Sequence, residues 1–334
     1  MPETFKTAPP RNGKARPERG GETSFREEIC LPFLLKAQNE DGGWGYRLGQ
    51  RSAVEPTSWT LLELASLSDS SAFEQAAGGA INWLLAGQLP DGSWAAYPDQ
   101  KEGCWTTALA GLALHAHGRA QDAVAKGFEW LCDAWPGEGA LWRRLQQRLF
   151  ARSNAVRQNP SLRGWSWTPG TSSWVEPTAY TLILLHHLYP NELPRRVEKR
   201  RRLAEAMLYD RMCPGGGWNS GNPLDYGVAG VPLVVPTVWA LLALQDHPAR
   251  RENQASLEWL ARACETMQGP ASLGLAHICL AAYSRPAGSL EPTLRGLYAK
   301  NEFLGSVPVA AWAAMALGPE CRWLSWQRRG TGQP

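Results

Sequence analysis

Several common features are missing from this 334-residue sequence, and each absence narrows the possibilities. No run of 18 apolar residues occurs, so no transmembrane span is expected. The seven cysteines form no CxxC pair, which predicts free thiols in a reducing cytoplasm. The formal charge is only +3, too small to predict a nucleic-acid partner.

The two ends of the chain lack the pattern of a folded segment. Residues 1–24 are polar and contain no apolar core, which predicts a disordered tail in place of a signal peptide. Residues 327–334 are expected to form a second short tail. The sequence between them, 25–326, is interpreted as a single repeat domain with an insertion at 136–163.

Tryptophan, by contrast, is abundant, and its spacing reveals an internal repeat. Seventeen tryptophans occur, most of them at corresponding positions of similar stretches. The clearest stretch is 164–185, GWSWTPGTSSWVEPTAYTLILL, and related copies occupy 42–64 and 215–244. Each copy has a glycine–tryptophan loop, a connector, and Pro-Thr before an apolar helix. Such self-similarity predicts a repeat architecture.

The local signals inside each repeat predict a helical hairpin. Glycines such as Gly42 end a first helix, because glycine readily takes the left-handed conformation found there. Proline, as at Pro56, suits the first position of the second helix. The second helices are apolar on nearly every side and are expected to be buried. Six hairpins can be counted, and they could stack in a line or close into a ring.

The repeat resembles that of the squalene–hopene and oxidosqualene cyclases and the protein prenyltransferase β subunits. The glutamine–tryptophan motif of these proteins matches Trp83-Leu84-Leu85, Gln88, Gly92 and Trp94. A threonine before each apolar helix is shared as well, at Thr57, Thr106, Thr178 and Thr237. The resemblance implies an all-α, α/α toroid of six inner and six outer helices. It also implies that the partner is an apolar isoprenoid held in a central cavity.

The catalytic signatures of that superfamily are incomplete here. Class II cyclases carry an Asp-x-Asp-Asp tetrad before one inner helix, and the corresponding residues here are Trp174-Val175-Glu176-Pro177. Only Glu176 remains, at the position of the proton-donating aspartate. The prenyltransferase zinc set is also missing, because His277 has no Asp-x-Cys partner and zinc needs at least three protein ligands. We therefore expect neither a metal nor another cofactor.

Glu176 and Glu55 share a Val-Glu-Pro-Thr context and are the candidate catalytic residues. The alternative is that both only cap helices, since a carboxylate at a helix N-terminus gains about 0.3–1 kcal/mol from the helix dipole. The dipole favours the ionised carboxylate and so opposes a raised pKa, and only burial would act in the other direction.

Aromatic residues of the loops and inner helices are the candidate substrate-binding residues, because aromatic faces attract a cation by about 0.5–2 kcal/mol. The alternative is that the loop tryptophans pack between repeats. The candidates are Trp165, Trp167, Trp174, Tyr180, Trp59 and Trp239.

The insertion has the composition of a basic amphipathic helix. Between positions 141 and 175 there are six arginines and no acidic residue. Arg144, Arg148 and Arg152 alternate with leucines, a pattern that predicts contact with an anionic membrane surface. A solvated outer helix is the alternative. A cytoplasmic protein, peripheral to a membrane, is expected on this basis.

Three functions remain open from the sequence alone. The first is an isoprenoid-binding or isoprenoid-transforming relative of the cyclases that uses Glu176. The second is a non-catalytic toroid that binds a lipid or a protein. The third is a glycosidase, because Glu55 and Glu176, two repeats apart, could flank a substrate as inverting carboxylate pairs do. Whether the ring encloses an apolar cavity would discriminate best between these functions, and a filled centre would end the enzyme hypothesis.

Overall fold

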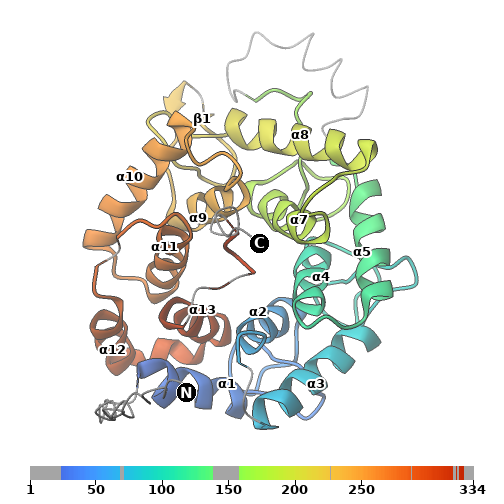
Figure 1. The fold of residues 1–334 in the computed structure, drawn as a ribbon, viewed down its shortest axis with the longest axis vertical. Coiled ribbons are helices and arrows are strands. Elements are labelled where there is room, and N and C mark those ends of the chain that lie inside the picture. Colours follow the sequence, from blue (N-terminus) through green and yellow to red (C-terminus); the bar gives the residue numbers. More distant parts are fainter. Residues whose placement is uncertain are drawn as a thin grey trace, which may run out of the picture.

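Six α-helices form a closed inner ring in the computed structural model (Figure 1). The structure describes residues 24–67, 71–137, 158–225, 227–286, 288–318, 321 and 323–326. Each inner helix contacts the next one along the chain, and the last contacts the first, which closes the ring. In order they are α2 (Val54–Leu64), α4 (Thr106–Ala116), α7 (Val175–Leu188), α9 (Val234–Ala243), α11 (Pro270–Ala282) and α13 (Val307–Leu317).

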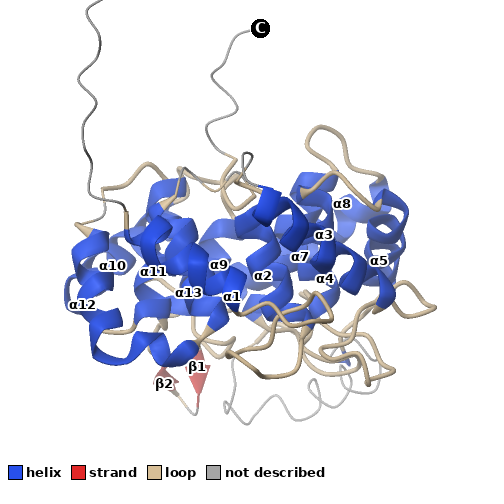
Figure 2. Cartoon of the chain, turned by 90° about the horizontal axis from the view of Figure 1, so that it is seen from below, coloured by secondary structure: helices blue, strands red, loops and turns tan. Residues whose placement is uncertain are grey.

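The remaining helices surround this ring (Figures 1 and 2). They are η1 (Arg26–Cys30) with α1 (Leu31–Lys36), α3 (Ser71–Ala86), α5 (Gln121–Asp133), α8 (Arg195–Asp210), α10 (Arg251–Thr266) and α12 (Leu290–Asn301), followed by the short η3 (Glu302–Gly305). In the described ranges the strands are β1 (Leu224–Asp225) and β2 (Val228–Ala229), which pair antiparallel before α9. The predicted α/α toroid is confirmed.

Burial explains why one set of helices lies inside. Every residue of α2 except Glu55 is buried, as its continuous apolar sequence requires. The outer helix α8 buries a single stripe, including Val197, Ala204 and Leu208, and leaves charged residues outside. A helix that is apolar all round is stable only when neighbours cover every side.

A repeated set of hydrogen bonds joins each loop tryptophan to both helices of its hairpin. The backbone N–H of Trp44 donates to Thr57 Oγ1 at 2.9 Å, and its indole Nε1 donates to Leu34 O at 2.7 Å. The same pair of bonds recurs in three further repeats. The corresponding sets are Trp94 with Thr107 and Leu84, Trp165 with Thr178 and Leu131, and Trp218 with Thr237 and Leu208.

In the second repeat, the threonine that binds the loop tryptophan lies one residue later than the sequence analysis expected. The hydroxyl that accepts the Trp94 N–H belongs to Thr107 and not to Thr106. Thr106 Oγ1 instead donates to Trp94 O at 3.0 Å. The sequence contains the signal that identifies Thr107, because in the first and third repeats too the threonine follows the loop tryptophan by 13 residues.

Glycine precedes the loop tryptophan where the inner helix leaves no space for a side chain. A Cβ atom at Gly164 would lie 2.1 Å from Thr178 Oγ1, the atom that accepts the Trp165 N–H. The glycine of this motif is therefore needed for close backbone approach. The glutamines of the motif bind backbone, as Gln88 Nε2 donates to both Gly92 O and Ala123 O at 2.8 Å.

Replacing Thr178 by valine should destabilise the fold by about 1–3 kcal/mol, because the buried Trp165 N–H loses its acceptor. Urea unfolding of the purified protein measures the change in the free energy of unfolding. The matched control is Thr181→Val on the same helix, whose hydroxyl only donates to Pro177 O one turn earlier. Equal losses in the two variants would contradict a special role for the tryptophan–threonine bond.

Candidate functional site

Three aromatic side chains from three inner helices meet inside the ring. Trp59 of α2 and Trp239 of α9 stack with ring centroids 4.9 Å apart. Tyr180 of α7 contacts both, at 5.8 Å from Trp59 and 5.0 Å from Trp239. Because α2 and α9 lie opposite each other in the ring, this stack crosses its centre. The middle of the ring is therefore filled with aromatic rings at this level.

Three more tryptophans extend this group. Trp312 of α13 lies 5.9 Å from Trp59, Trp105 lies 5.7 Å from Tyr180, and Trp167 lies 4.9 Å from Trp105. Trp105, Trp167 and Trp312 are half-buried, whereas Trp59, Tyr180 and Trp239 are buried. We call the six residues the central aromatic cluster. Its half-buried members are the part that a molecule from solvent could reach.

Glu55 lies at the start of α2, one turn before Trp59. Its carboxyl accepts a 2.5 Å hydrogen bond from the Tyr46 hydroxyl and a 3.4 Å bond from Trp59 Nε1. Burial raises the pKa of Glu55, and the two hydrogen bonds lower it by less. Its proton is thus retained to higher pH than on an ordinary glutamate.

Glu176 occupies the same position on α7, one turn before Tyr180. It is 8% exposed, and its Oε2 is buried with no hydrogen-bond partner. The carboxyl accepts a hydrogen bond from its own backbone N–H, which lowers its pKa, but burial is the larger effect and raises it. The bond from the backbone N–H is the kind of contact that a helix-capping side chain makes. Burial acts in the other direction and favours the protonated form of Glu176, because it removes water from the carboxylate.

The two glutamates converge on Tyr180. Burial raises the pKa of the Tyr180 phenol well above its usual range, and the nearby charges of Glu55 and Glu176 raise it further. The structure thus brings together five of the residues selected from the sequence: Glu55, Trp59, Glu176, Tyr180 and Trp239. Trp167 joins them through Trp105.

Several polar atoms beside the cluster are buried without a partner. They include the indole Nε1 of Trp239 and of Trp312, and Ser58 Oγ on α2. Buried polar groups are nearly always hydrogen-bonded in proteins, so each unpaired one is costly. Glu176 Oε2 is buried without a partner as well.

The contacts of Trp165 and Trp174 join loops to helices, and neither residue is a member of the central aromatic cluster. Trp165 is one of the four loop tryptophans, and the Arg200 guanidinium lies 4.2 Å from its ring centroid. Trp174 is half-buried immediately before α7, where its backbone N–H donates to Trp165 O at 3.0 Å. Their contacts match the alternative of packing between repeats.

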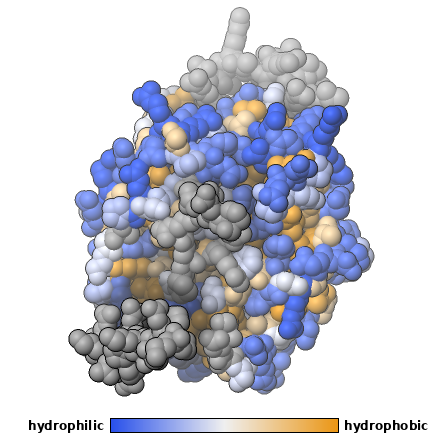
Figure 3. Space-filling model, viewed as in Figure 1, coloured by the Kyte–Doolittle hydropathy of each residue, from blue (hydrophilic) through white to orange (hydrophobic). Residues whose placement is uncertain are grey.

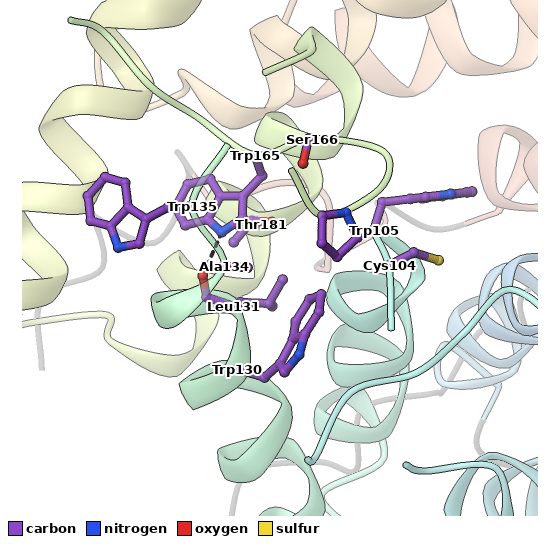
Figure 4. Close-up of a pocket in the computed structure, with 10 residues that line it drawn as sticks. Cys104, Trp105, Trp130, Leu131, Ala134, Trp135, Trp165, Ser166 and Thr181 are labelled. Carbon is purple, nitrogen blue, oxygen red and sulfur yellow. Dashed lines mark hydrogen bonds between the residues drawn. The ribbon is translucent and has the colours of Figure 1, made fainter. Parts of the chain in front are cut away.

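A narrow pocket borders the cluster on the side of α5 (Figure 4). Trp105, Trp130 and Trp165 line it, together with Cys104 and Thr181. Its volume is about 10 Å³, which is room for roughly one water molecule. The pocket as it stands is too small for an isoprenoid.

Among the described residues, no three His, Cys, Asp or Glu side chains are grouped so that they could hold a metal ion. Within the same ranges, no helix is both long and apolar enough to cross a membrane. Arg144, Arg148 and Arg152 lie outside the described residues.

Trp105, Trp312 and Tyr46 were missed by the sequence analysis. Trp105 stands in the second repeat where Glu55 stands in the first, a correspondence that could have identified it. Trp312 belongs to the most degenerate repeat, so its position could not be aligned. Tyr46 follows a loop tryptophan, and only the fold shows that its hydroxyl reaches Glu55.

Comparison with protein families agrees with this architecture. Residues 30–126 match the model of the squalene-hopene cyclase N-terminal domain. The first third of the chain is thus similar in sequence to the squalene–hopene cyclases. The chain is 30% identical over 133 residues to the squalene–hopene cyclase of Zymomonas mobilis, a match that covers 36% of this chain and 20% of the cyclase. An uncharacterized protein of Sinorhizobium fredii is 36% identical over 72 residues, 20% of this chain and 14% of that protein. The chain thus matches only a small part of these curated relatives.

Solved structures of similar fold cover more of the chain. A crystal structure of a protein from Actinoplanes superposes with a TM-score of 0.55 at 17% identity, covering 88% of this chain and 97% of that one. The fold is therefore shared along nearly the whole length of both. A type II terpene cyclase from Scytonema in complex with geranylgeranyl dihydroxybenzoate has a TM-score of 0.49 at 15% identity, covering 87% and 78%.

Proposed function

We propose that this squalene cyclase-like protein binds an isoprenoid-type apolar molecule against the half-buried face of the central aromatic cluster. Because aromatic side chains fill the centre of the ring, catalysis inside a central cavity is not part of this proposal, and any proton transfer from Glu176 takes place at that face. The observation that carries the proposal is geometric: the largely buried carboxyls of Glu55 and Glu176 lie one turn before Trp59 and Tyr180, respectively, whose rings contact each other in the central aromatic cluster. The superfamily match favours an isoprenoid over the glycosidase alternative. The ligand would enter along the half-buried faces of Trp105 and Trp167.

The chemistry of the two acids differs from that of the class II tetrad. In the tetrad, neighbouring aspartates activate the acid, whereas here no second carboxylate adjoins Glu176 in the sequence. Burial alone raises its pKa, so the proton is retained but the acid is not strengthened. Such a group suits proton transfer to an allylic or oxygen-bearing isoprenoid better than to an unactivated alkene. The cluster would stabilise a developing cation through its ring faces.

Replacing Glu176 by glutamine should abolish product formation while leaving the protein as stable as the wild type or more stable at pH 8. The pKa of Glu176 is higher in the folded chain than in the unfolded one, so wild-type stability falls as pH rises through the raised pKa. Glutamine carries no charge and escapes this loss. Thermal melts at pH 5 and pH 8, beside product analysis by mass spectrometry with squalene and linear prenyl alcohols and diphosphates, measure both effects.

The matched control is Glu252→Gln in the first turn of α10. The pKa of Glu252 is lowered by its hydrogen bond from Arg250, so its charge stabilises the fold and the variant should melt slightly lower at pH 8. A Glu176→Gln variant that melts lower and keeps wild-type products would show that Glu176 only caps α7. Wild-type protein that binds these compounds without product would identify a binding protein instead of an enzyme.

Binding should depend on the half-buried tryptophans of the cluster. Trp105→Leu is expected to weaken binding of a prenyl alcohol such as geranylgeraniol about 3- to 10-fold, because an aromatic face is lost. Tryptophan fluorescence titration measures the affinity. Trp83→Leu is the control, since Trp83 lies on α3 and donates to Asp41 away from the cluster. Equal affinities of both variants and the wild type would contradict the proposed site.

We also propose that the face on which the inner helices begin contacts a membrane. Of the large apolar residues there, Val228 is 70% exposed, Val231 74% and Leu233 52%. Val228 lies in β2 of the projecting hairpin seen in Figure 2, and Val231 and Leu233 lie in the connector from β2 to α9. The end of the basic insertion joins this region, where Gln158 Nε2 donates to Gly221 O at 2.7 Å. Apolar side chains beside a basic segment suit an anionic lipid surface.

Liposome co-sedimentation tests this contact. A Val228→Asp, Val231→Asp variant and an Arg144→Glu, Arg148→Glu, Arg152→Glu variant should each sediment less with anionic vesicles, since each arginine contributes about 1 kcal/mol near such a surface. Leu85→Asp, on the outer helix α3 and 38% exposed, is the control and should sediment like the wild type. Binding of the wild type that is insensitive to salt and to both variants would contradict the proposal.

A further inference from the structure

A second cavity lies between the inner and outer helices, on the face where the inner helices end. Its walls come from α7 and the loop after it, from α8, from the end of α9 and from Trp326. Its volume is about 220 Å³, much larger than that of the pocket beside the central aromatic cluster. A cavity of about 150 Å³ inside a protein can hold a benzene molecule, so this one has room for a slightly larger organic molecule. Figure 3 views the molecule from this face, where apolar residues lie between the helices inside a hydrophilic periphery.

One side of this cavity is apolar. Leu182 and Leu185 of α7, Leu193 of the following loop and Ala243 at the end of α9 contribute hydrocarbon surface. The indole of Trp326 adds an aromatic surface to the same lining. A ligand with a hydrocarbon part would gain free energy by moving that part from water onto this wall.

The other side carries three charged groups, which are Arg201 and Glu205 of α8 and Asp246 just after α9. All three nitrogens of the Arg201 guanidinium already donate to carboxylates. Its Nη1 donates to Glu205 Oε1 at 2.7 Å, and its Nε and Nη2 donate to the Glu198 carboxylate at 2.9 and 3.2 Å. Arg201 is therefore a poor site for an anion from solvent.

Asp246 is the carboxylate of this cavity that has no permanent cation beside it. Its Oδ1 accepts from Trp326 Nε1 at 2.8 Å, and its Oδ2 lies 3.7 Å from His186 Nδ1. In the described part of the chain, no lysine or arginine lies at ion-pair distance from it. The His186 imidazole and the Trp326 N–H stabilise the carboxylate more than burial destabilises it, which holds the pKa of Asp246 below its usual value. Because Arg201 offsets only Glu205, the lining has one negative charge in excess.

We propose that this cavity binds a small organic ammonium ion, with its charged nitrogen against Asp246 and its hydrocarbon part against the leucine wall. An anion would meet the carboxylates of Asp246 and Glu205, and a neutral molecule would leave the excess charge without a partner. A metal ion is also disfavoured, since no three His, Cys, Asp or Glu side chains are grouped to hold one in the described ranges. Charges attract more strongly where protein replaces water around them, which favours a cation inside the cavity. The cavity shares no lining residue with the central aromatic cluster, so the two sites are independent.

Calorimetric titration of the full-length protein at pH 8 tests the class of ligand. Benzylamine, benzyl alcohol and benzoate have nearly the same skeleton but carry a positive, no and a negative charge. Benzylamine should bind at least about tenfold more tightly than benzyl alcohol, because only the ammonium pairs with Asp246. Benzoate should not bind. Equal affinities for the amine and the alcohol, tighter binding of benzoate, or no binding of benzylamine at millimolar concentration would each overturn the proposal.

Two variants locate the site. Asp246→Asn keeps an oxygen that can accept the Trp326 N–H, so it should melt like the wild type. Its affinity for benzylamine should fall about tenfold, while its affinity for benzyl alcohol stays the same. Ala243→Leu places hydrocarbon in the cavity and should weaken the binding of both compounds. Asp99→Asn is the matched control, because Asp99 is an exposed carboxylate that pairs with Arg51 and does not line the cavity.

Trp105→Leu separates this cavity from the central aromatic cluster. It should leave the affinity for benzylamine unchanged, since Trp105 contacts Tyr180 in the cluster and does not line the cavity. Benzylamine binding that Trp105→Leu weakens as much as Asp246→Asn does would contradict the proposal. Folded Asp246→Asn protein with wild-type affinity for the amine would do the same, and that variant decides the matter if Ala243→Leu does not fold.

Discussion

The tryptophan–threonine hydrogen bond found in four of the six repeats is the contact on which the rest of the ring depends. It fixes the loop to the inner helix, and the indole N–H of the same tryptophan fixes the loop to the outer helix. Because both partners are buried, leaving either polar group unpaired is costly. The bond therefore sets the register of the inner helix, and so decides which of its side chains point along the ring axis.

That register brings the aromatic residues of α2, α7 and α9 together. Trp59, Tyr180 and Trp239 each follow their threonine by two residues, so equivalent positions on three helices meet at the centre. The glutamates one turn earlier in α2 and α7 lie beside the same cluster and are desolvated by it. Equivalent positions of the repeated sequence thus meet at the ring axis, with two consequences. Their aromatic side chains fill the centre, and the glutamates one turn earlier are buried, which raises their pKa values.

The central aromatic cluster is built by the inner helices and by residues just before them, so it cannot leave without repacking the ring. It joins α2, α7, α9 and α13, and Trp105 joins it from the position just before α4. No carboxylate adjoins Glu176 in the sequence, so burial is the main cause of its raised pKa.

The sequence alone determined the elements that depend on local chemistry. Glycine at helix ends and proline–threonine at helix starts predicted the helical hairpins, and repetition singled out Glu55, Glu176 and the loop tryptophans. The number of hairpins was compatible with a line or a ring, and the ring was expected only from the resemblance to the cyclases. Tertiary structure decided everything that depends on residues far apart in the chain. Ring closure, through the contact of α13 with α2, decided that Trp59 meets Trp239, that Trp312 and Trp105 join them, and that Trp165 and Trp174 do not. It also decided that burial outweighs the helix dipole at Glu176, because desolvation is set by packing from other repeats and not by the residues beside it in the sequence.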